Sequence, residues 1–578
     1  MNMLDNNEKN EALMAEEKYK SAVESASDYI ENFDILETIT NVGNDEVFTP
    51  RKTCDMILDS LPEEVWHNPN YKWLNPATKN GIFEREIAIR LDAGLKNIIT
   101  DTEKRRKHIL QNMIFSIGQT RFTANVARRT VYYCSQANRK CDGIKAEDSH
   151  YVNGYAIGNG TWFSDEEGNI KTPNIAHAFV DSNGKLMPDL CKPDERKKYR
   201  CKYCGINGNS SYNDSNQRET YAYEFIHFNK EKILEHLQDR FFGGDKNMKF
   251  DIIIGNPPYQ LSDGGGDGSS AAPIYQLFVE QAILLKPKYM SMIIPARWYS
   301  GGKGLDEFRD KMLHDKRIYE LHDFPETSDV FNQLNIRGGI CYFLWDSSYS
   351  GDCNIYNHKN KKINFVKRPI IENGVSTFIR YNEAISILNK VKKLNEPTMD
   401  SKVSSRLPFG IESNFENYET TIKNGASIRL YRSERGTNKT SKSEFYINPK
   451  YILKNKEWTT RKKVLVSKAS PGGDEYPHSI ISQPIFADVN SACTETYLIV
   501  DFVDTTEEGL NLISYMKTKF FRFMMCLIKN TQNISKSVFA FVPIQDISKP
   551  WTDDELYKKY KFTKDEIEFI DSMIREMK

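Results

Sequence analysis

The clearest structural signal in this chain is the segment Phe250-Asp251-Ile252-Ile253-Ile254-Gly255-Asn256-Pro257-Pro258-Tyr259. Its run of isoleucines is typical of a parallel strand that is covered on both faces, since such strands are apolar throughout. Gly255 lets the backbone turn, and the two prolines after it stiffen the chain and remove backbone donors. The segment therefore predicts a central strand of an α/β sheet that ends in a rigid polar loop.

The loop after this strand has the groups that would activate an aromatic amine. The lone pair of such an amine is delocalised into its ring, so the nitrogen is a poor nucleophile. Neutral acceptors that bind the amine hydrogens free the lone pair, and the Asn256 side-chain oxygen and the Pro257 carbonyl are suitable acceptors. Pro258 stiffens the loop and Tyr259 can stack on the ring. A proline-rich turn without a chemical role is the alternative, but the preceding strand favours a catalytic site at Asn256, Pro257, Pro258 and Tyr259.

This strand and loop resemble those of the gamma-class, TaqI-like N6-adenine DNA methyltransferases of type II restriction–modification systems. The resemblance covers residues 46–346 by motif and the remainder by domain order. It implies an N-terminal helical arm over 1–45 and an α/β, doubly wound Rossmann-like methyltransferase domain over 46–350. A C-terminal α+β target-recognition domain would occupy 351–578. The implied reaction transfers a methyl group from S-adenosylmethionine directly to an adenine that is flipped out of double-stranded DNA.

The resemblance also places the cofactor against two turns that precede the catalytic loop. Thr49 and Pro50 match the family's Thr-Pro motif, in which Thr49 would cap a helix that begins at Pro50 and leaves N–H groups for the cofactor's carboxylate. The segment 71–83 is typical of a strand and a turn that lead into a helix, which is where ligands bind in doubly wound folds. Asn75 replaces an acid of the family pattern and Lys79 replaces a glycine. The residues that fit the pattern are Pro76, Ala77, Gly81 and Phe83.

Two later segments would complete the cofactor site. Residues 114–120 predict the next strand, and Gly118 stands where the family has an acid for the ribose, so Gln119 or Thr120 would supply those hydrogen bonds. Residues 221–227 predict another strand, in which Glu224-Phe225 matches the family's contact with the adenine of the cofactor. His227 is expected to be a polar residue at the end of this strand without a catalytic role. The predicted cofactor-binding residues are thus Thr49, Pro50, Asn75, Pro76, Ala77, Gly81, Gln119, Glu224 and Phe225.

Residues 134–220 are expected to form an insertion with a zinc-ribbon-like site. Cys201-Lys202-Tyr203-Cys204-Gly205 has the spacing of a zinc half-site. Cys134 and His177 are the predicted second pair, with Cys141 as the rival ligand, so the predicted metal ligands are Cys134, His177, Cys201 and Cys204. The insertion has few aliphatic residues, and a structural zinc ion would explain how it folds. A loop with unligated thiols is the alternative.

Two further segments are expected to contact DNA. Phe331 matches the aromatic residue that, with Tyr259, holds the flipped base in the family, although a core phenylalanine is the alternative. Between residues 402 and 468 the chain has 15 lysines and arginines, six glutamates and no aspartate, which gives a formal charge of +9. Aromatic residues stand between these charges, and the combination suits contact with DNA phosphates and base edges. A solvated charged face is the alternative, and the family's domain order favours DNA binding.

The bulk composition predicts a cytoplasmic protein of two or more domains. The chain has 578 residues, of which 39% are hydrophobic, and a formal net charge of zero. The first 20 residues are polar and charged, so no signal peptide is expected, and no apolar run approaches the length of a membrane span. Ten cysteines with no sign of secretion predict reduced thiols.

Three other functions fit parts of the sequence. Glutamine N5-methylation of a protein would use the same loop, but it would need no large basic C-terminal domain. A bifunctional restriction enzyme and methyltransferase would need a nuclease motif, and no spaced acidic pair followed by Glu-x-Lys stands in a suitable context. A catalytically impaired DNA-binding homologue is motivated by the altered turn at residues 75–81. A separate cognate restriction endonuclease is an expected partner.

Overall fold

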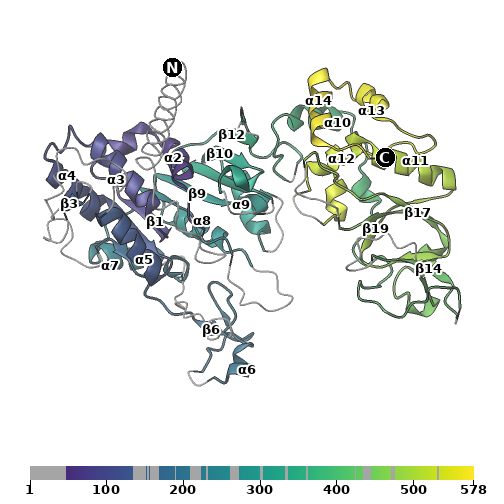
Figure 1. Ribbon diagram of the computed structural model, residues 1–578, viewed down its shortest axis with the longest axis horizontal. Coiled ribbons are helices and arrows are strands. Elements are labelled where there is room, and N and C mark those ends of the chain that lie inside the picture. Colours follow the sequence, from purple (N-terminus) through teal and green to yellow (C-terminus); the bar gives the residue numbers. More distant parts are fainter. Residues whose placement is uncertain are drawn as a thin grey trace, which may run out of the picture.

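The computed structural model describes residues 47–133, 151–152, 155–156, 168–188, 191–208, 223–228, 232–260, 272–299, 304–331, 336, 338–359, 362–375, 377–423, 425–433, 444–469, 476–529 and 533–577. The predicted arm over 1–45 lies outside them. Figure 1 shows two bodies, of which the purple-to-teal one contains a nine-stranded sheet and the green-to-yellow one contains two three-stranded sheets. Within the ranges given, no helix has both the length and the apolar character that crossing a membrane requires.

The nine-stranded sheet is mixed. Its order is β13 (Lys362–Arg368), β12 (Cys353–Lys359), β10 (Ile318–Phe324), β11 (Ile340–Asp346), β9 (Tyr289–Pro295), β8 (Ile252–Gly255), β1 (Trp73–Thr78), β2 (Ile114–Gly118) and β5 (Ile170–Lys171). Neighbours from β5 to β9 are parallel, whereas β11 is antiparallel to both β9 and β10. The predicted isoleucine strand is β8, it lies in the middle of the sheet, and all four of its residues are buried. The prediction of an α/β fold is confirmed.

Helices cover both faces of this sheet, because alternate strand residues enter two separate cores. In β8, Ile253 belongs to one core, whereas Ile252 and Ile254 belong to the other. The first core also contains residues of α7 (Ile233–Phe242), α8 (Tyr275–Leu284), η6 (Ala296–Tyr299) and α9 (Asp306–His314). The second contains residues of α2 (Arg51–Asp59), η2 (Glu63–Trp66), α3 (Ile82–Gly94), η3 (Ile109–Met113), α5 (Arg121–Arg128) and η4 (Arg129–Tyr133). The helix α4 (Thr102–His108) directly precedes η3.

The sheet reverses its order at β1, and this position builds a crevice. From β1 the chain passes through α3 to β2 on one side, whereas β8 lies on the other side and leads on to β9. In open α/β sheets the connections diverge at such a point and leave a crevice at the carboxyl ends of the strands. Glycine is required at position 255 for the close approach of β8 to β1, because a Cβ atom there would lie 2.6 Å from the Oδ1 atom of Asn75. The carboxyl end of β8 therefore packs directly against Asn75 of β1.

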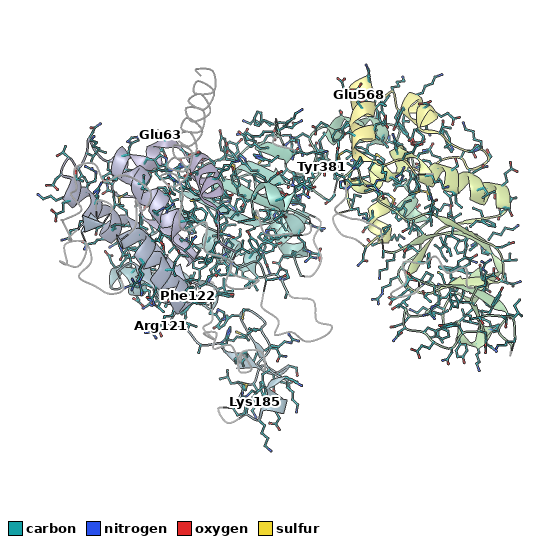
Figure 2. The ribbon with its side chains drawn as sticks, viewed as in Figure 1. Glu63, Arg121, Phe122, Lys185, Tyr381 and Glu568 are labelled. Carbon is teal, nitrogen blue, oxygen red and sulfur yellow. The ribbon has the colours of Figure 1, made fainter. Side chains whose placement is uncertain are left out.

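The predicted insertion contributes to the main sheet and also forms a projection. β5 pairs with β2, so the sheet itself continues into the segment that was expected to lie outside it. β6 (Phe179–Val180) and β7 (Arg200–Cys201) form an antiparallel hairpin that contains α6 (Pro193–Arg196) and projects from the first body (Figure 1). Lys185 lies towards the far end of this projection (Figure 2). The backbone also pairs β3 (Tyr151–Val152) with β4 (Tyr155–Ala156).

The prediction of a strand over residues 221–227 is wrong for residues 223–227, which the structure describes. Glu224–Ile226 forms the 3₁₀ turn η5, which is closed by a hydrogen bond from the Ile226 N–H to the Tyr223 carbonyl at 3.1 Å. Its three side chains are all buried. The consecutive apolar and aromatic residues that suggested a strand are instead packed around this turn.

Residues after 350 first complete the sheet and then form the second body. β12 and β13 belong to this sheet although they follow residue 350, where the methyltransferase domain was predicted to end. The assignment of functions to the two domains stays a prediction. The second body has the sheets β15 (Tyr446–Ile447)–β14 (Ile428–Tyr431)–β18 (Ser491–Cys493) and β17 (Ile485–Ala487)–β16 (Lys462–Ser467)–β19 (Tyr497–Val503). Its helices and turns are α10 (Ala384–Lys392), η8 (Met399–Ser401), η9 (Pro449–Tyr451), η10 (Lys456–Thr460), α11 (Thr506–Lys517), α12 (Lys519–Cys526), η11 (Lys536–Phe539), α13 (Asp553–Lys559) and α14 (Lys564–Met573). β16 separates two cores, because Val464 and Val466 face the helices and Leu465 faces the β14 sheet.

Candidate functional site

Asn256 lies directly after β8, and its side-chain amide is held in one orientation. Its Nδ2 atom donates to the Val47 carbonyl at 3.2 Å and to the Thr49 hydroxyl at 3.1 Å. The side chain is buried, and its Oδ1 atom has no hydrogen-bond partner in the described part of the chain. A buried acceptor is rarely left without a partner. The loop therefore presents a fixed, neutral acceptor for a donor that comes from outside the protein.

Tyr259 and Phe331 belong to the same core cluster beside this acceptor. Tyr259 is partly buried and packs against the cluster that contains Phe331. Burial raises the pKa of the Tyr259 hydroxyl well above its ordinary value, so the phenol stays neutral near pH 7. Tyr259 can thus offer a ring face to a planar ligand, but it is a poor general base. Phe331 is only 2% exposed, and its contact with such a ligand stays a prediction. Pro257 and Pro258 are both buried.

A narrow hollow joins the predicted cofactor residues to Asn256. It is lined by Thr49, Asn75, Ala77, Thr78, Lys79, Asn80, Gly81, Ile82, Phe83, Glu84 and Asn256. The structure therefore brings together Thr49, Asn75, Ala77 and Gly81, as predicted. Gly81 has a φ of +78°, and a Cβ atom there would lie 2.9 Å from the Ala127 Cα atom, so the turn requires glycine. Pro76 lies in β1 beside these residues.

The Thr-Pro segment lies at the hollow in a slightly different geometry from the predicted one. α2 begins at Arg51, with Pro50 and not Thr49 in the capping position, and no side chain caps the helix. The Thr49 hydroxyl instead accepts the hydrogen bond from Asn256. Thr49 thus orients the Asn256 amide, while the first N–H groups of α2 have no side-chain partner.

Asn75 stands in a network that explains why it is not an acid. Its Nδ2 atom donates to Oε1 of the buried Glu84 at 2.9 Å, and the Ser116 hydroxyl donates to the same oxygen at 2.6 Å. Its Oδ1 atom accepts from the Ala77 N–H at 3.1 Å. An aspartate at position 75 would face the Glu84 carboxyl as a second acidic group, which is unfavourable when both are buried. Glu84 was not predicted, because its role depends on contacts with Asn75 and Ser116 that no motif indicates.

The pKa of Glu84 gives a testable pH dependence. Burial raises this pKa, and the hydrogen bonds from Ser116, Thr78 and Asn75 offset the effect only in part. The native state therefore binds the proton more tightly than the unfolded state, and stability is lost as pH rises through the native pKa. We expect Glu84→Gln, which cannot ionise, to gain stability relative to the unmodified protein between pH 5 and pH 8.

Thermal midpoints of the two proteins at both pH values measure this effect, since about 1 kcal/mol shifts the midpoint of a domain of 150–250 residues by about 2–4 °C. A difference between the proteins that is the same at both pH values would show that Glu84 does not titrate in this range. Ser116→Ala is the matched control, because it removes one hydrogen bond but no ionisable group.

Gln119 lies at the carboxyl end of β2 and has an unused donor. Its backbone N–H binds the Thr78 carbonyl at 3.2 Å, which places it beside the hollow, and its buried Nε2 atom has no partner among the described residues. Thr120 is already engaged, because its hydroxyl caps α5 by accepting from the Thr123 N–H at 3.1 Å. Of the two residues proposed for the ribose, the geometry favours Gln119.

Glu224 and Phe225 are not among the residues that line the hollow. Glu224 is 1% exposed and accepts from His236 at 2.7 Å and from the Asn174 N–H at 3.0 Å, with the Arg240 guanidinium at 3.4 Å. Phe225 is fully buried and stacks on Phe278 with ring centroids 5.9 Å apart. Their contact with the cofactor stays a prediction, and in this structure they hold η5 in place.

Four metal-ligating side chains meet where the hairpin contacts η5. The candidate ligand atoms of His177, Cys201, Cys204 and His227 all lie within 4.8 Å of one another, and this cluster could bind zinc. Three of the four predicted metal ligands, His177, Cys201 and Cys204, belong to this cluster. The fourth, Cys134, lies outside the described residues, as does its rival Cys141. The fourth position is occupied by His227, which sequence reasoning had set aside. His227 was not predicted as a ligand because it stands 23 positions after Cys204, outside any zinc-site spacing. The signal that could have indicated it is its position directly after the buried residues of η5.

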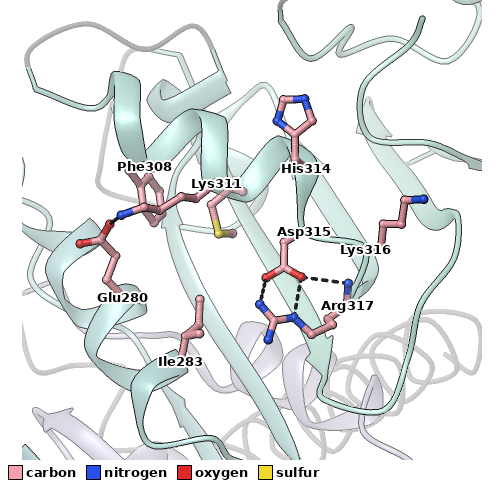
Figure 3. A pocket seen from close by; sticks show the side chains of 9 residues that line it. Glu280, Ile283, Phe308, Lys311, His314, Asp315, Lys316 and Arg317 are labelled. Atoms are coloured by element: carbon pink, nitrogen blue, oxygen red, sulfur yellow. Dashed lines mark hydrogen bonds and ion pairs between the residues drawn. The ribbon is translucent and has the colours of Figure 1, made fainter. Parts of the chain in front are cut away.

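A second hollow lies away from these residues, between α8 and α9. It has a volume of about 440 Å³ and is lined by Glu280, Ile283, Phe308, Lys311, Met312, His314, Asp315, Lys316 and Arg317 (Figure 3). Four of its charged groups form two ion pairs, with Lys311 at 3.0 Å from Glu280 and Arg317 at 2.7 Å from Asp315. This pairing leaves little polar capacity for a ligand, so the hollow at Asn256 is the better candidate site.

The sequence of this chain is similar to those of known DNA methylases. A family model described as "Eco57I restriction-modification methylase" matches residues 112–331. An "Uncharacterized adenine-specific methylase" of Mycoplasma pneumoniae is 45% identical over 372 residues, which covers 63% of this chain and 80% of that protein.

Two solved structures are more distantly similar. The Type IIL restriction-modification enzyme MmeI in complex with DNA is 11% identical, with a TM-score of 0.42, over 84% of this chain and 65% of that one. The DrdV–DNA complex is 9% identical, with a TM-score of 0.44, over 85% of this chain and 55% of that one. This chain thus spans less than two thirds of either solved protein, and likenesses at this level carry no argument about its function.

Proposed function

This chain belongs to the Eco57I family of adenine-specific DNA methylases of restriction–modification systems, and we propose that it methylates N6 of an adenine flipped out of double-stranded DNA. It is an adenine-specific DNA methyltransferase. The observation that carries the proposal is the orientation of Asn256, whose Nδ2 atom is bound by Val47 and Thr49 while Oδ1 is left without a partner. A flipped adenine would supply the missing donor from its amino group.

Each residue of the loop has a distinct role in this reaction. The Asn256 Oδ1 atom and the Pro257 carbonyl accept the two amino hydrogens, so the nitrogen becomes pyramidal and its lone pair becomes available. Pro258 keeps these acceptors fixed, and fixed dipoles need no reorganisation during the reaction. Tyr259 stacks on the base and stays neutral because burial raises its pKa. The proton leaves after transfer, so no strong base is required.

We assign the hollow to S-adenosylmethionine, which would supply the methyl group as a sulfonium. The hollow has a volume of about 10 Å³, so its walls would have to separate to admit the cofactor. Three features of the described residues support the assignment. The start of α2 has N–H groups that no side chain caps, which suits a carboxylate. Gln119 has a buried donor without a partner, which suits a ribose hydroxyl. The turn at Gly81 tolerates no side chain, which suits close approach of a ligand to the backbone.

The order of the motifs supports the gamma class for this enzyme. The Thr49 segment precedes β1, the catalytic loop follows β8, and the second body follows both. In this class the second body would recognise the target sequence in DNA. A partner restriction endonuclease encoded separately is part of the proposal, because the matching family is described as a restriction-modification methylase.

Ion pairs engage part of the positive charge of the second body. Acids pair with several of its basic residues, as in Arg406–Glu495 at 2.7 Å, Arg429–Glu444 at 3.1 Å and Lys423–Glu419 at 3.3 Å. A group of exposed cations remains between β15 and β16: Lys450, Lys454, Lys456 and Arg461. We propose that this group contacts DNA phosphates.

The double variant Lys454→Ala/Lys456→Ala is expected to bind DNA more weakly and with a smaller dependence on salt. Each lost phosphate contact lowers the slope of log K against log[salt] by about 0.9, so loss of both lowers it by about 2. Fluorescence anisotropy with labelled duplex DNA at several salt concentrations measures the slope. The control is Lys104→Ala/Lys107→Ala in α4, which also removes two exposed lysines. An unchanged slope for the first pair would show that this group does not contact DNA.

Modified-base sequencing tests the proposed function as a whole. A methylation-free bacterial host that expresses this chain is expected to contain N6-methyladenine in one short motif, and a host that expresses Asn256→Ala is expected to contain none. Methylated cytosine would overturn the proposal. If a host with folded protein contains no methylated base, calorimetry with S-adenosylmethionine decides the matter. No heat indicates an impaired DNA-binding homologue and overturns the proposal, whereas binding calls for an assay on duplex DNA of random sequence, in which no methyl transfer would overturn it.

A further inference from the structure

The cluster of two cysteines and two histidines has the geometry of a zinc site. The Cys201 Sγ atom lies 3.5 Å from the His227 Nε2 atom, and the Cys204 Sγ atom lies 3.6 Å from the His177 Nδ1 atom. Zinc binds sulfur at about 2.3 Å and imidazole nitrogen at about 2.0–2.1 Å, so tetrahedral coordination separates sulfur from nitrogen by about 3.5–3.6 Å. Both measured distances agree with this value.

The backbone around the cysteines also has the form of a metal knuckle. Cys201 ends β7, and Cys204 follows after two residues in a turn closed by the Gly205 N–H and the Cys201 carbonyl at 2.8 Å. Gly205 has a φ of +76°, which glycine adopts without strain. The turn therefore points both sulfur atoms to the same side, where the histidines lie.

His227 is already in the tautomer that a metal requires. Its Nδ1 atom lies 2.6 Å from the Tyr223 carbonyl, which can only accept, so Nδ1 carries the proton. Nε2 then has a free lone pair and faces Cys201. A backbone carbonyl that fixes the second nitrogen of a histidine is the usual support for a metal ligand.

We infer that His177, Cys201, Cys204 and His227 bind one structural zinc ion. Four protein ligands leave no open position for a substrate, and Cys201, Cys204 and His227 are buried, which argues against a catalytic metal. The ligands come from three segments: His177 precedes β6, Cys201 ends β7 with Cys204 in the turn after it, and His227 follows η5. The ion therefore fastens the projecting hairpin to η5.

The metal content of the full-length protein tests this inference. Protein purified without chelators is expected to contain about one zinc ion per chain, as measured by mass spectrometry of the metal. Cys201→Ser and His227→Ala are expected to retain less than about one tenth of it. Cys191→Ser is the matched control, because Cys191 is a buried thiol of the same hairpin that lies outside the cluster. Loss of zinc in Cys134→Ser or Cys141→Ser would overturn the assignment of His227.

Cobalt substitution keeps the inference testable if the variants fold poorly. Cobalt exchanged into the unmodified protein is expected to show the strong visible bands of a tetrahedral site and a thiolate charge-transfer band. His227→Cys should still bind cobalt, with a more intense charge-transfer band because a third thiolate is present. No metal in the purified protein together with no tetrahedral cobalt spectrum would overturn the inference, as would a Cys201–Cys204 disulfide found in the native protein.

Limited proteolysis supplies a readout that does not depend on methylation. Removal of the metal by a chelator is expected to increase the cleavage rate within residues 168–208 at least about tenfold, because metal binding contributes directly to the folding of such sites. Cleavage elsewhere in the chain should change little. Equal rates with and without the chelator would show that the ion does not hold the hairpin.

Discussion

Asn256→Ala is expected to lower kcat for adenine methylation by about 10²–10³-fold, which is the usual effect of removing one preorganised polar group from a reacting centre. The Oδ1 atom that would bind the amino group is lost, while the groups proposed to hold the cofactor at the start of α2 and at Gln119 are unchanged. Binding of S-adenosylmethionine and of DNA should therefore change little. Single-turnover methylation with a tritiated methyl donor measures the effect on the chemical step directly.

The stability of the variant separates this role from a structural one. Asn256→Ala leaves the Thr49 hydroxyl without its donor and removes one of the two donors to the Val47 carbonyl, which keeps the bond from Lys79, and this loss costs about 1–3 kcal/mol in folding. Asn511→Ala is the matched control, because Asn511 is also buried and donates to one carbonyl, that of Ile547 at 2.9 Å, in the second body. The control should lose similar stability and keep its kcat. A kcat for Asn256→Ala within about threefold of the original would refute the acceptor role.

The sequence predicted the fold where the pattern is local and strongly apolar. The isoleucine run of β8 predicted a central strand, because a strand that is apolar throughout has both faces covered. The spacing of Gly81 and Phe83 predicted the turn after β1. The continuation of the sheet through β12 and β13 was not predicted, because β13 is an edge strand with mostly exposed side chains and lacks that signal. The turn η5 was missed because its fold depends on partners such as His236, which are distant in sequence.

The candidate site shows the same limit. Thr49, Asn75 and Asn256 were predicted because each stands in a recognisable motif, and the structure brings them to one hollow. The link from Asn256 to Thr49 and the burial of Glu84 were not predictable, since both arise from contacts between segments. His227 was missed for the same reason, because no fixed spacing relates it to Cys204. Motifs therefore located the groups, and the tertiary contacts determined what each group does.

Lys79→Met is expected to weaken binding of S-adenosylmethionine by about 10–100-fold, since a hydrogen bond to a charged group is worth about 1.5–3 kcal/mol. Lys79 stands where the family has a glycine, and its buried side chain lines the hollow with Thr49. Its Nζ atom donates to the Val47 carbonyl at 2.8 Å and lies 5.9 Å from the centre of the Tyr259 ring. The carboxylate is the anionic group of this cofactor, so a buried cation in the wall is a suitable partner for it.

The contact between Lys79 and the carboxylate can be tested from both sides, by removing the lysine from the protein or the carboxylate from the cofactor. The unmodified enzyme should bind decarboxylated S-adenosylmethionine more weakly than the intact cofactor, whereas Lys79→Met should bind both with similar affinity. Calorimetry measures the four affinities, and kcat at saturating cofactor should stay within a few fold, because Lys79 acts on binding. Lys52→Met, at an exposed position of α2, is the control and should change neither affinity. Tighter binding by Lys79→Met would mean that the lysine obstructs the hollow, and the altered turn would then be a restraint on cofactor binding.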